Sequence, residues 1–258
     1  MIGSGAIGGP IIDALVDEEV PGCVLARILT LDPLPERVAG ARASDVEELI
    51  AASDLVVEAA GHAPLASLGP PVVEAGVDLL VMSVGALVDD ALLQRLSRPD
   101  GGRLLISTGA VGGLDTLLAA MLVAPLDSVA LTSRKPAEVL VRPWMSPELK
   151  AALADSDGEV EAFSGPAREA VKLFPESANI AATLSLATVG FDRLRVRIVG
   201  TRDLSLVDHH VAAEGKSGSY DFRFRNRPAE SNPRTSAIAP FSVIRALRRL
   251  NARTVIGV

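Results

Sequence analysis

The first eight residues constrain the fold of this chain more than any other stretch. Gly3, Gly5 and Gly8 form a G-x-G-x-x-G pattern in which each glycine has its own physical purpose. The first allows a tight turn out of a strand, the second removes a side chain that would hold a phosphate away, and the third lets a helix approach the sheet. The first N–H groups of that helix attract negative charge. The pattern is typical of a turn that binds a dinucleotide.

The residues that follow continue this pattern. Pro10 opens a segment whose apolar residues recur at spacings of three and four, as in a helix. An apolar run over 24–31 then ends in Asp32, where a Rossmann unit places the carboxylate that binds the ribose hydroxyls of its cofactor. Because such a carboxylate repels a 2′-phosphate, we expect NAD to be preferred. NADP is the alternative, since Arg37 lies nearby and partly offsets that repulsion.

Composition excludes several classes of partner. The chain has 258 residues, 48% of them hydrophobic, and a net charge of −7, which disfavours nucleic acid because phosphate binding needs a basic face. Its single cysteine, Cys23, excludes an internal disulfide and a cysteine-cluster metal site, and we expect a buried, inert thiol. With no run of eighteen apolar residues, we expect a cytoplasmic protein without a membrane partner.

Residues 1–110 alternate between short apolar strands and helices, which is typical of a doubly wound parallel sheet of the Rossmann type. The expected strands lie at 55–58, 78–82 and 103–106, and the expected helices at 45–52, 65–75 (interrupted by Pro70 and Pro71) and 89–96. A central strand needs about five residues, so Met1 and Ile2 predict either an upstream start or a very short first strand. Cofactors bind at the carboxyl ends of such strands, which include Ala60, Gly61, His62, Ser83 and Ala110.

Residues 111–235 predict an α+β domain for substrate binding and dimerisation. We expect helices at 114–123, 165–173 and 179–189, and strands at 128–133 and 193–199, with strands at 207–214 and 219–225 that continue an antiparallel sheet. A closing helix within 236–258 is expected to pack back on the first domain. One sheet face would stay uncovered within the chain, and an uncovered apolar face tends to associate. We therefore expect a homodimer through this domain.

Short motifs along nearly the whole chain resemble the L-aspartate dehydrogenase family. They are residues 3–8 (GSGAIG), 58–62 (EAAGH), 83–87 (SVGAL), 107–115 (STGAVGGLD), 134–136 (RKP), 174–184 (FPESANIAATL), 209–211 (HHV) and 232–236 (NPRTS). The resemblance implies NAD(P)-dependent oxidation of L-aspartate to iminoaspartate, which hydrolyses to oxaloacetate and ammonia or enters NAD biosynthesis. It requires no metal.

The resemblance also implies roles for single residues. His209, the first histidine of the HHV motif, would be the catalytic acid/base, while His210 points to the other face of its strand. Substrate carboxylates would meet Lys135, Thr235 and Ser236, and Lys135 is the rival base to exclude. Asn179, also expected to cap a helix, and Ala110 would contact the nicotinamide side of the cofactor. The full cofactor set is Gly3, Gly5, Ala6, Ile7, Gly8, Asp32, Ala60, Gly61, His62, Ser83, Ala110 and Asn179.

Two other hypotheses stay open. The same architecture serves oxidoreductases of the dihydrodipicolinate reductase or homoserine dehydrogenase type, which would not reduce NAD with aspartate. A non-catalytic NAD-binding sensor would bind the cofactor without turnover of any amino acid. Aspartate-dependent reduction of NAD distinguishes all three.

Overall fold

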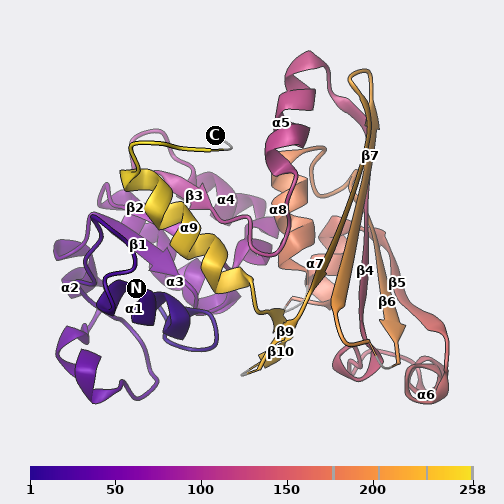
Figure 1. Cartoon of the computed structure of the whole chain (residues 1–258), viewed down its shortest axis with the longest axis horizontal. Helices are drawn as coiled ribbons and strands as arrows, with labels where there is room; N and C mark the ends of the chain where they lie inside the picture. Colours follow the sequence, from indigo (N-terminus) through magenta and orange to yellow (C-terminus); the bar gives the residue numbers. More distant parts are fainter. Residues whose placement is uncertain (176–177, 203, 231, 257–258) are drawn as a thin grey trace. The chain divides into compact units, whose positions relative to one another are not determined.

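The computed structural model describes residues 1–175, 178–202, 204–230 and 232–256, which form two compact units (Figure 1). The first unit contains Met1–Gly109 and Ala239–Val258, and the second contains Ala110–Ile238. Each unit has its own sheet. Among the described residues, no helix is both long and apolar enough to cross a membrane.

The first unit is built on a parallel sheet. Its strands β1 (Leu55–Glu58), β2 (Asp78–Val81) and β3 (Leu104–Ile106) lie in that order. Ile2 adds to the edge at β1, because it forms parallel bridges with both Glu58 and Leu29. Ile2 thus lies between Leu29 and Glu58, and the strand order reverses direction beside it. This topology confirms the doubly wound parallel sheet.

Helices cover this sheet. They are α1 (Gly8–Val16), α2 (Val46–Ala51), α3 (His62–Glu74), α4 (Asp90–Leu96) and α9 (Ala239–Asn251), with 3-10 turns η1 (Glu36–Ala41) and η2 (Val84–Val88). The closing helix α9 belongs to this core, since Val243 and Leu247 join a buried cluster with Ile11, Ile12 and Leu80. The opposite side of α9 carries exposed arginines, so the helix is amphipathic and its apolar stripe faces the unit.

Three local expectations for the first unit are wrong. Helix α3 runs through Pro70 and Pro71 without interruption, because its buried face, which includes Val72 and Val73, outweighs the lost backbone hydrogen bonds. The run over 24–31 is no continuous strand, since only residues 28 and 29 form bridges there. Cys23 is half-buried and not fully buried, and it receives a hydrogen bond from Asn251 Nδ2 at 3.2 Å; burial raises the pKa of its thiol.

The second unit is built on a five-stranded mixed sheet. Its order is β5 (Glu159–Pro166), β6 (Arg195–Thr201), β4 (Leu126–Pro136), β7 (Val207–Gly215) and β8 (Gly218–Asn226). β7 and β8 form the expected antiparallel hairpin, but β4 lies between β6 and β7 and runs parallel to β6. The parallel pairing of β4 with β6 was not predicted, and β5 lies in a region for which no strand was predicted. A separate pair, β9 (Pro228–Ala229) and β10 (Asn232–Ser236), follows.

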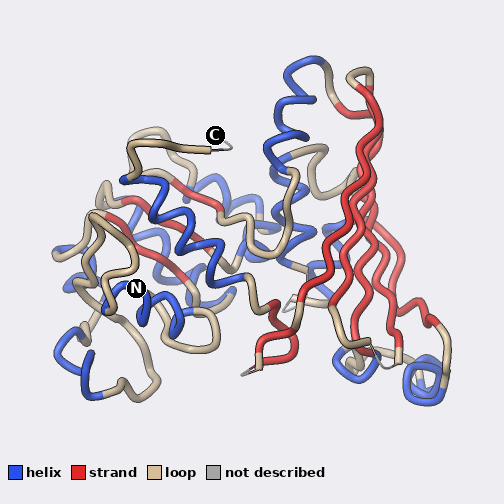
Figure 2. The backbone as a smooth tube through the Cα atoms, viewed as in Figure 1, coloured by secondary structure: helices blue, strands red, loops and turns tan. Residues whose placement is uncertain are grey.

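The helices of this unit are α5 (Leu114–Val123), α6 (Pro147–Asp155), α7 (Ala167–Leu173) and α8 (Asn179–Ala187), with the turn η3 (Ala137–Val139). Figures 1 and 2 show α5, α7 and α8 along one face of the sheet. The other face is strongly charged: its side chains include Arg134, Arg197, His210, Asp221, Arg223 and Arg225. No described helix of this unit covers this face, as expected, but the face is charged and not apolar, because the alternating strands turn their charged residues outward.

Candidate functional site

The glycine-rich turn has the shape that a dinucleotide needs. Gly3 has a φ of +89°, and a Cβ there would lie 2.8 Å from the carbonyl oxygen of Ala59. A Cβ at Gly8 would overlap the carbonyl of Gly3, whereas a Cβ at Gly5 would meet no atom within 4 Å. The turn is therefore pressed against the end of β1 and leaves open space over Gly5. These residues fit a pyrophosphate that approaches the backbone closely.

Asp32 is connected to this turn through a threonine. The hydroxyl groups of Ser4 and Thr30 lie 2.9 Å apart, and Thr30 Oγ1 also accepts the backbone N–H of Asp32 at 3.2 Å. The carboxylate of Asp32 is exposed. Arg42 donates to the carbonyl oxygens of Thr30 and Asp32 at 2.6 Å each, while Arg37 forms ion pairs in the region of α1 instead. The cation bound at the Asp32 loop is thus Arg42 and not Arg37.

A buried carboxylate joins two of the predicted cofactor loops. Glu58, at the end of β1, has no exposed surface. Its Oε1 accepts the N–H groups of Ala60 at 2.7 Å and Gly61 at 2.9 Å, and the hydroxyl of Ser83 at 2.8 Å. Its Oε2 accepts the N–H of Ser83 at 3.1 Å. Glu58 therefore holds Ala60, Gly61 and Ser83 together at the carboxyl edge of the sheet, and His62 follows as the first residue of α3.

Sequence reasoning quoted Glu58 within a motif but gave it no role. The available signal was a charged residue that ends an otherwise apolar strand, directly before a glycine-containing loop. A carboxylate at such a place must be hydrogen-bonded if it is buried.

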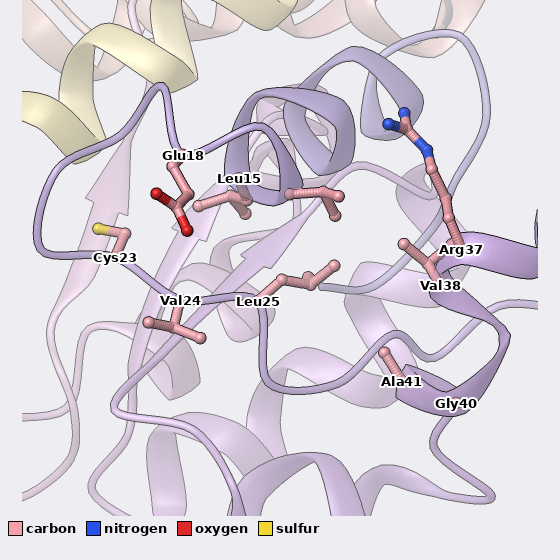
Figure 3. Close-up of a pocket in the computed structure, with 10 residues that line it drawn as sticks. Leu15, Glu18, Cys23, Val24, Leu25, Arg37, Val38, Gly40 and Ala41 are labelled. Carbon is pink, nitrogen blue, oxygen red and sulfur yellow. The ribbon is translucent and has the colours of Figure 1, made fainter.

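The first unit also has a pocket of about 390 Å³, which Figure 3 shows in close-up. Its lining includes Leu15 and Val16 at the carboxyl end of α1, and Val38 from η1. None of the fingerprint glycines lines it, because they lie at the other end of α1. Its walls are mainly apolar and its one arginine, Arg37, is ion-paired with Asp13 and Asp17. This pocket is separate from the predicted cofactor edge.

The second unit gathers three polar side chains on the helix-covered face of its sheet. Ser133 on β4 lies directly opposite His209 on β7, and Lys135 follows two residues after Ser133 on the same face. All three are buried, with exposed fractions of 4% for Ser133, 5% for Lys135 and 2% for His209. The Ser133 Oγ lies 2.9 Å from Nδ1 of His209.

Burial changes the proton affinity of both basic groups. It lowers the pKa of His209 to about 3, and the charge of Lys135 contributes to the same shift. Burial also lowers the pKa of Lys135 to about 8, with a contribution from the charge of Arg142. The imidazole therefore does not keep the ordinary histidine pKa of 6.5. Near neutral pH the lysine is charged and the histidine is neutral.

His210 lies on the opposite face of β7, as strand geometry predicts. Its Nε2 lies 2.6 Å from a carboxylate oxygen of Asp221 on β8. Asp208, also on that face, is ion-paired with Arg223 at 2.5 Å, and hydrogen bonds from Arg223 keep the pKa of Asp208 below its usual range. On the outer face, His210 is thus paired with Asp221 and Arg223 with Asp208.

The remaining predicted residues of the second unit are dispersed over several elements. Asn179 is the first residue of α8, but the capping position belongs to Ala178, so the expected asparagine cap is wrong. The carbonyl of Ala110 accepts a hydrogen bond from Asn226 at 3.3 Å. Thr235 and Ser236 lie on β10, outside the five-stranded sheet, and the buried hydroxyl of Ser236 has no hydrogen-bond partner. A buried, unsatisfied hydroxyl suits a ligand contact.

The structure therefore brings one set of predicted residues together at the carboxyl edge of the first sheet and Lys135 with His209 on one face of the second, while Ala110, Asn179, Thr235 and Ser236 lie on other elements. Glu176 and Ser177, within the matched segment 174–184, lie outside the described residues. The described part of the chain has no group of three or more histidine, cysteine, aspartate or glutamate side chains arranged to hold a metal ion.

Family models match most of the chain. Residues 3–99 match the model described as "Homoserine dehydrogenase, NAD binding domain", and residues 115–250 match the one described as "Aspartate dehydrogenase, C-terminal". The second model alone covers more than half of the sequence. The first model lies within the unit that contains the glycine-rich turn and supports a nicotinamide cofactor there.

Individual relatives agree with these models. The chain is 40% identical to the L-aspartate dehydrogenase of Polaromonas sp., over 96% of this chain and 95% of that protein, and 37% identical to that of Methanosarcina barkeri, over 100% and 98%. The crystal structure of aspartate dehydrogenase from Thermotoga maritima has a TM-score of 0.75, with 24% identity over 99% of this chain and 97% of that one, and supports the fold. The chain thus belongs to the L-aspartate dehydrogenase family of oxidoreductases.

Proposed function

We propose that this protein oxidises L-aspartate to iminoaspartate and transfers a hydride to NAD, after which water converts the imine to oxaloacetate and ammonia. The observation that carries the proposal is the pair of His209 and Lys135, two buried basic side chains on one sheet face. They occur in a chain that is 40% identical to an L-aspartate dehydrogenase. Oxidation of a dicarboxylic amino acid needs both a cation for a carboxylate and a proton acceptor for the amine.

Lys135 is the proposed carboxylate-binding group. Its ammonium is buried, and a buried charge attracts an opposite charge more strongly than an exposed one does. A pKa of about 8 leaves the group charged in neutral solution. Ser236, with its unsatisfied buried hydroxyl, and its neighbour Thr235 are proposed as further hydrogen-bonding groups for the substrate.

His209 is the proposed acid/base. Hydride leaves the α-carbon readily only when the amine is neutral, so a base must first take an ammonium proton. A neutral imidazole with a pKa of about 3 is a weak base. A bound substrate brings two carboxylates into the neighbourhood of His209, and their negative charge raises the pKa of the imidazole toward neutrality. The substrate therefore activates the base that acts on it.

The cofactor supplies the hydride acceptor when it is bound. We propose that Gly3, Gly5, Ala6, Ile7 and Gly8 hold its pyrophosphate, and that Ala60, Gly61, His62 and Ser83 line its path along the sheet edge. Ala110 and Asn179 are proposed for the nicotinamide side.

We propose NAD as the preferred cofactor because the exposed carboxylate of Asp32 suits ribose hydroxyls and repels a 2′-phosphate. Arg42 is bound to two backbone carbonyls beside Asp32, so it is the cation that would favour NADP. A KM for NADP below that for NAD would overturn this preference, and Arg42→Ala should then selectively weaken NADP.

The decisive assay measures NADH formation from NAD with L-aspartate at alkaline pH. L-Glutamate, L-asparagine and L-homoserine are the controls, because each keeps the amino-acid group and changes the side-chain length or its charge. Turnover with L-aspartate alone supports the proposal. Activity with homoserine instead favours the homoserine dehydrogenase type, and cofactor binding without any turnover favours a sensor.

We also propose a homodimer that forms through the second unit. Helix α5 exposes the apolar side chains of Leu118 (51%), Leu122 (90%) and Val123 (70%), and clustered exposed apolar residues favour association. The chain mass is 26.8 kDa. Light scattering that gives this mass at micromolar concentration would exclude the dimer.

A further inference from the structure

The catalytic candidate His209 has a hydroxyl partner. Ser133 Oγ lies 2.9 Å from its Nδ1, and the two residues are directly opposite one another in the β4–β7 register. Both side chains are buried, so water does not compete readily for this contact. The backbone register of β4 and β7 therefore fixes the position of Ser133 relative to His209.

A neutral imidazole has one protonated nitrogen and one bare nitrogen, and only the bare one accepts a proton. The free imidazole side chain favours the tautomer with the proton on Nε2. A base that acts through Nε2 must reverse this preference, and it does so when an acceptor is placed beside Nδ1. Ser133 Oγ is in the position of such an acceptor.

We propose that Ser133 is a positioning residue for His209: its hydroxyl oxygen accepts the Nδ1–H and thereby leaves Nε2 bare as the proton acceptor. This inference rests on the proposed acid/base role of His209. When Nε2 takes the ammonium proton of the substrate, the imidazolium still donates its Nδ1–H to Ser133. The hydrogen bond persists in both protonation states, so the ring keeps one orientation throughout the reaction.

The neighbouring charged groups explain why a hydroxyl suits this place. Lys135, from β4, is the cation on the same face. Asp208, on β7 itself, is directed to the other face and paired with Arg223, while β8 places the apolar Phe224 opposite His209. A carboxylate at the position of Ser133 would stabilise the imidazolium and also neutralise Lys135. A hydroxyl orients the ring without either effect, so the base stays neutral until the substrate arrives.

The direct test is ¹⁵N NMR of histidine-labelled protein, because the nitrogen shifts distinguish a protonated ring nitrogen from a bare one. The chain has three histidines, and loss of a signal in His209→Gln assigns the relevant one. We expect protonated Nδ1 and bare Nε2 in the native protein. In Ser133→Ala the population should move toward the Nε2–H tautomer, and in Ser133→Thr, which keeps the hydroxyl, it should not.

Kinetics give the second measurement. Loss of a group that orients a functional histidine typically costs about 10- to 100-fold in activity, so kcat of Ser133→Ala should fall by that factor. The KM for aspartate and the Kd for NADH should stay close to native values, and Ser133→Thr should restore most of kcat. A merely structural role would lower the melting temperature without moving the tautomer.

The outcomes separate the two proposals. If the native protein does not reduce NAD with L-aspartate, the proposed function fails, whatever Ser133 does. Suppose instead that the native protein is active and that His209→Ala is inactive. The role of Ser133 alone is then wrong if native His209 carries its proton on Nε2, or if Ser133→Ala keeps full kcat. The native spectrum decides the tautomer even if Ser133→Ala fails to fold.

Discussion

The two units each bury charged or titratable polar groups, but they satisfy them in different ways. In the first unit, Glu58 is fully buried and accepts four hydrogen bonds from Ala60, Gly61 and Ser83. In the second unit, His209 and Lys135 are almost as buried, yet the charge of Lys135 disfavours protonation of the histidine and burial disfavours the charged form of both. The first arrangement supplies hydrogen-bond donors to the carboxylate that it buries, and the second disfavours the charged forms of its two basic groups.

Under the proposed roles, this difference distinguishes a structural carboxylate from a reactive pair of side chains. A carboxylate that is surrounded by donors holds two loops in place and contributes to stability. A pair of buried basic groups costs stability in the free protein, and active sites commonly carry such a cost because ligand charge relieves it. Replacing Glu58 should therefore lower the free energy of unfolding, and replacing Lys135 should raise it.

The largest expected effect is on catalysis. General-base catalysis typically contributes about 10²- to 10⁴-fold, so His209→Ala should lower kcat by that factor. The proposed pyrophosphate and ribose contacts lie in the first unit and His209 lies in the second, so the Kd for NADH should stay close to the native value. Steady-state kinetics with L-aspartate and fluorescence titration with NADH make the two measurements.

If Lys135 were the base instead, Lys135→Ala would abolish turnover while aspartate still bound, and His209→Ala would retain most of kcat. Under the proposed roles, Lys135→Ala raises the KM for aspartate. The variant that lowers kcat identifies the base, and the variant that raises the KM for aspartate identifies the carboxylate-binding group.

Lys135→Met should stabilise the free protein while it weakens aspartate binding. The pKa of Lys135 falls from its ordinary 10.5 to about 8 on folding, which corresponds to about 3 kcal/mol of unfavourable burial for the charged form. Below pH 8 both the folded and the unfolded chain carry the proton, and the folded state bears this whole cost. Between pH 8 and 10.5 only the unfolded chain keeps the proton, so native stability rises with pH.

The gain of Lys135→Met is therefore largest at neutral pH and disappears above pH 10.5. Denaturant unfolding of both proteins at pH 7 and pH 10.5 measures it. If Lys135→Met is less stable than the native protein at pH 7, the buried charge of Lys135 does not destabilise the folded state.

Glu58→Gln should have the opposite sign. The glutamine amide keeps one acceptor oxygen but turns N–H groups toward donors at Ala60, Gly61 or Ser83. An unsatisfied buried donor costs about 1–3 kcal/mol, so we expect a loss of about 2 kcal/mol in the free energy of unfolding. Because these loops are proposed to bind the cofactor, the KM for NAD should also rise. If both the free energy of unfolding and the KM for NAD stay unchanged, Glu58 does not stabilise these loops.

Sequence reasoning located the elements whose signals are local. The glycine turn was recognised because each glycine has a steric reason, and α5 agrees with its expected bounds at both ends. Long-range packing was not visible in the same way. Pro70 and Pro71 predicted an interruption of α3 that its buried face overrides. The position of β4 between β6 and β7 depends on pairings between distant strands that no local pattern specifies.

The contrast between local signals and long-range packing also explains which site residues could be predicted from the sequence. The sequence nominated His209 and Lys135 from motifs, but it could not find Ser133, because a serine in a strand acquires meaning only from the residue opposite to it. Nor could it give the pKa of His209, which depends on burial beneath helices and on a lysine from another strand.

The smallest expected effect belongs to His210, the matched control for His209. Both changes to alanine remove an imidazole from β7, one residue apart, but the side chain of His210 is 35% exposed and its partner Asp221 is 73% exposed. Exposed ion pairs contribute little because water and salt screen them and because ordering two side chains costs entropy. His210→Ala should therefore change the free energy of unfolding by no more than about 0.5 kcal/mol, and kcat by no more than about twofold. Denaturant unfolding and the aspartate assay measure both, and a loss of kcat as large as that of His209→Ala would mean that the outer face of the sheet takes part in the reaction.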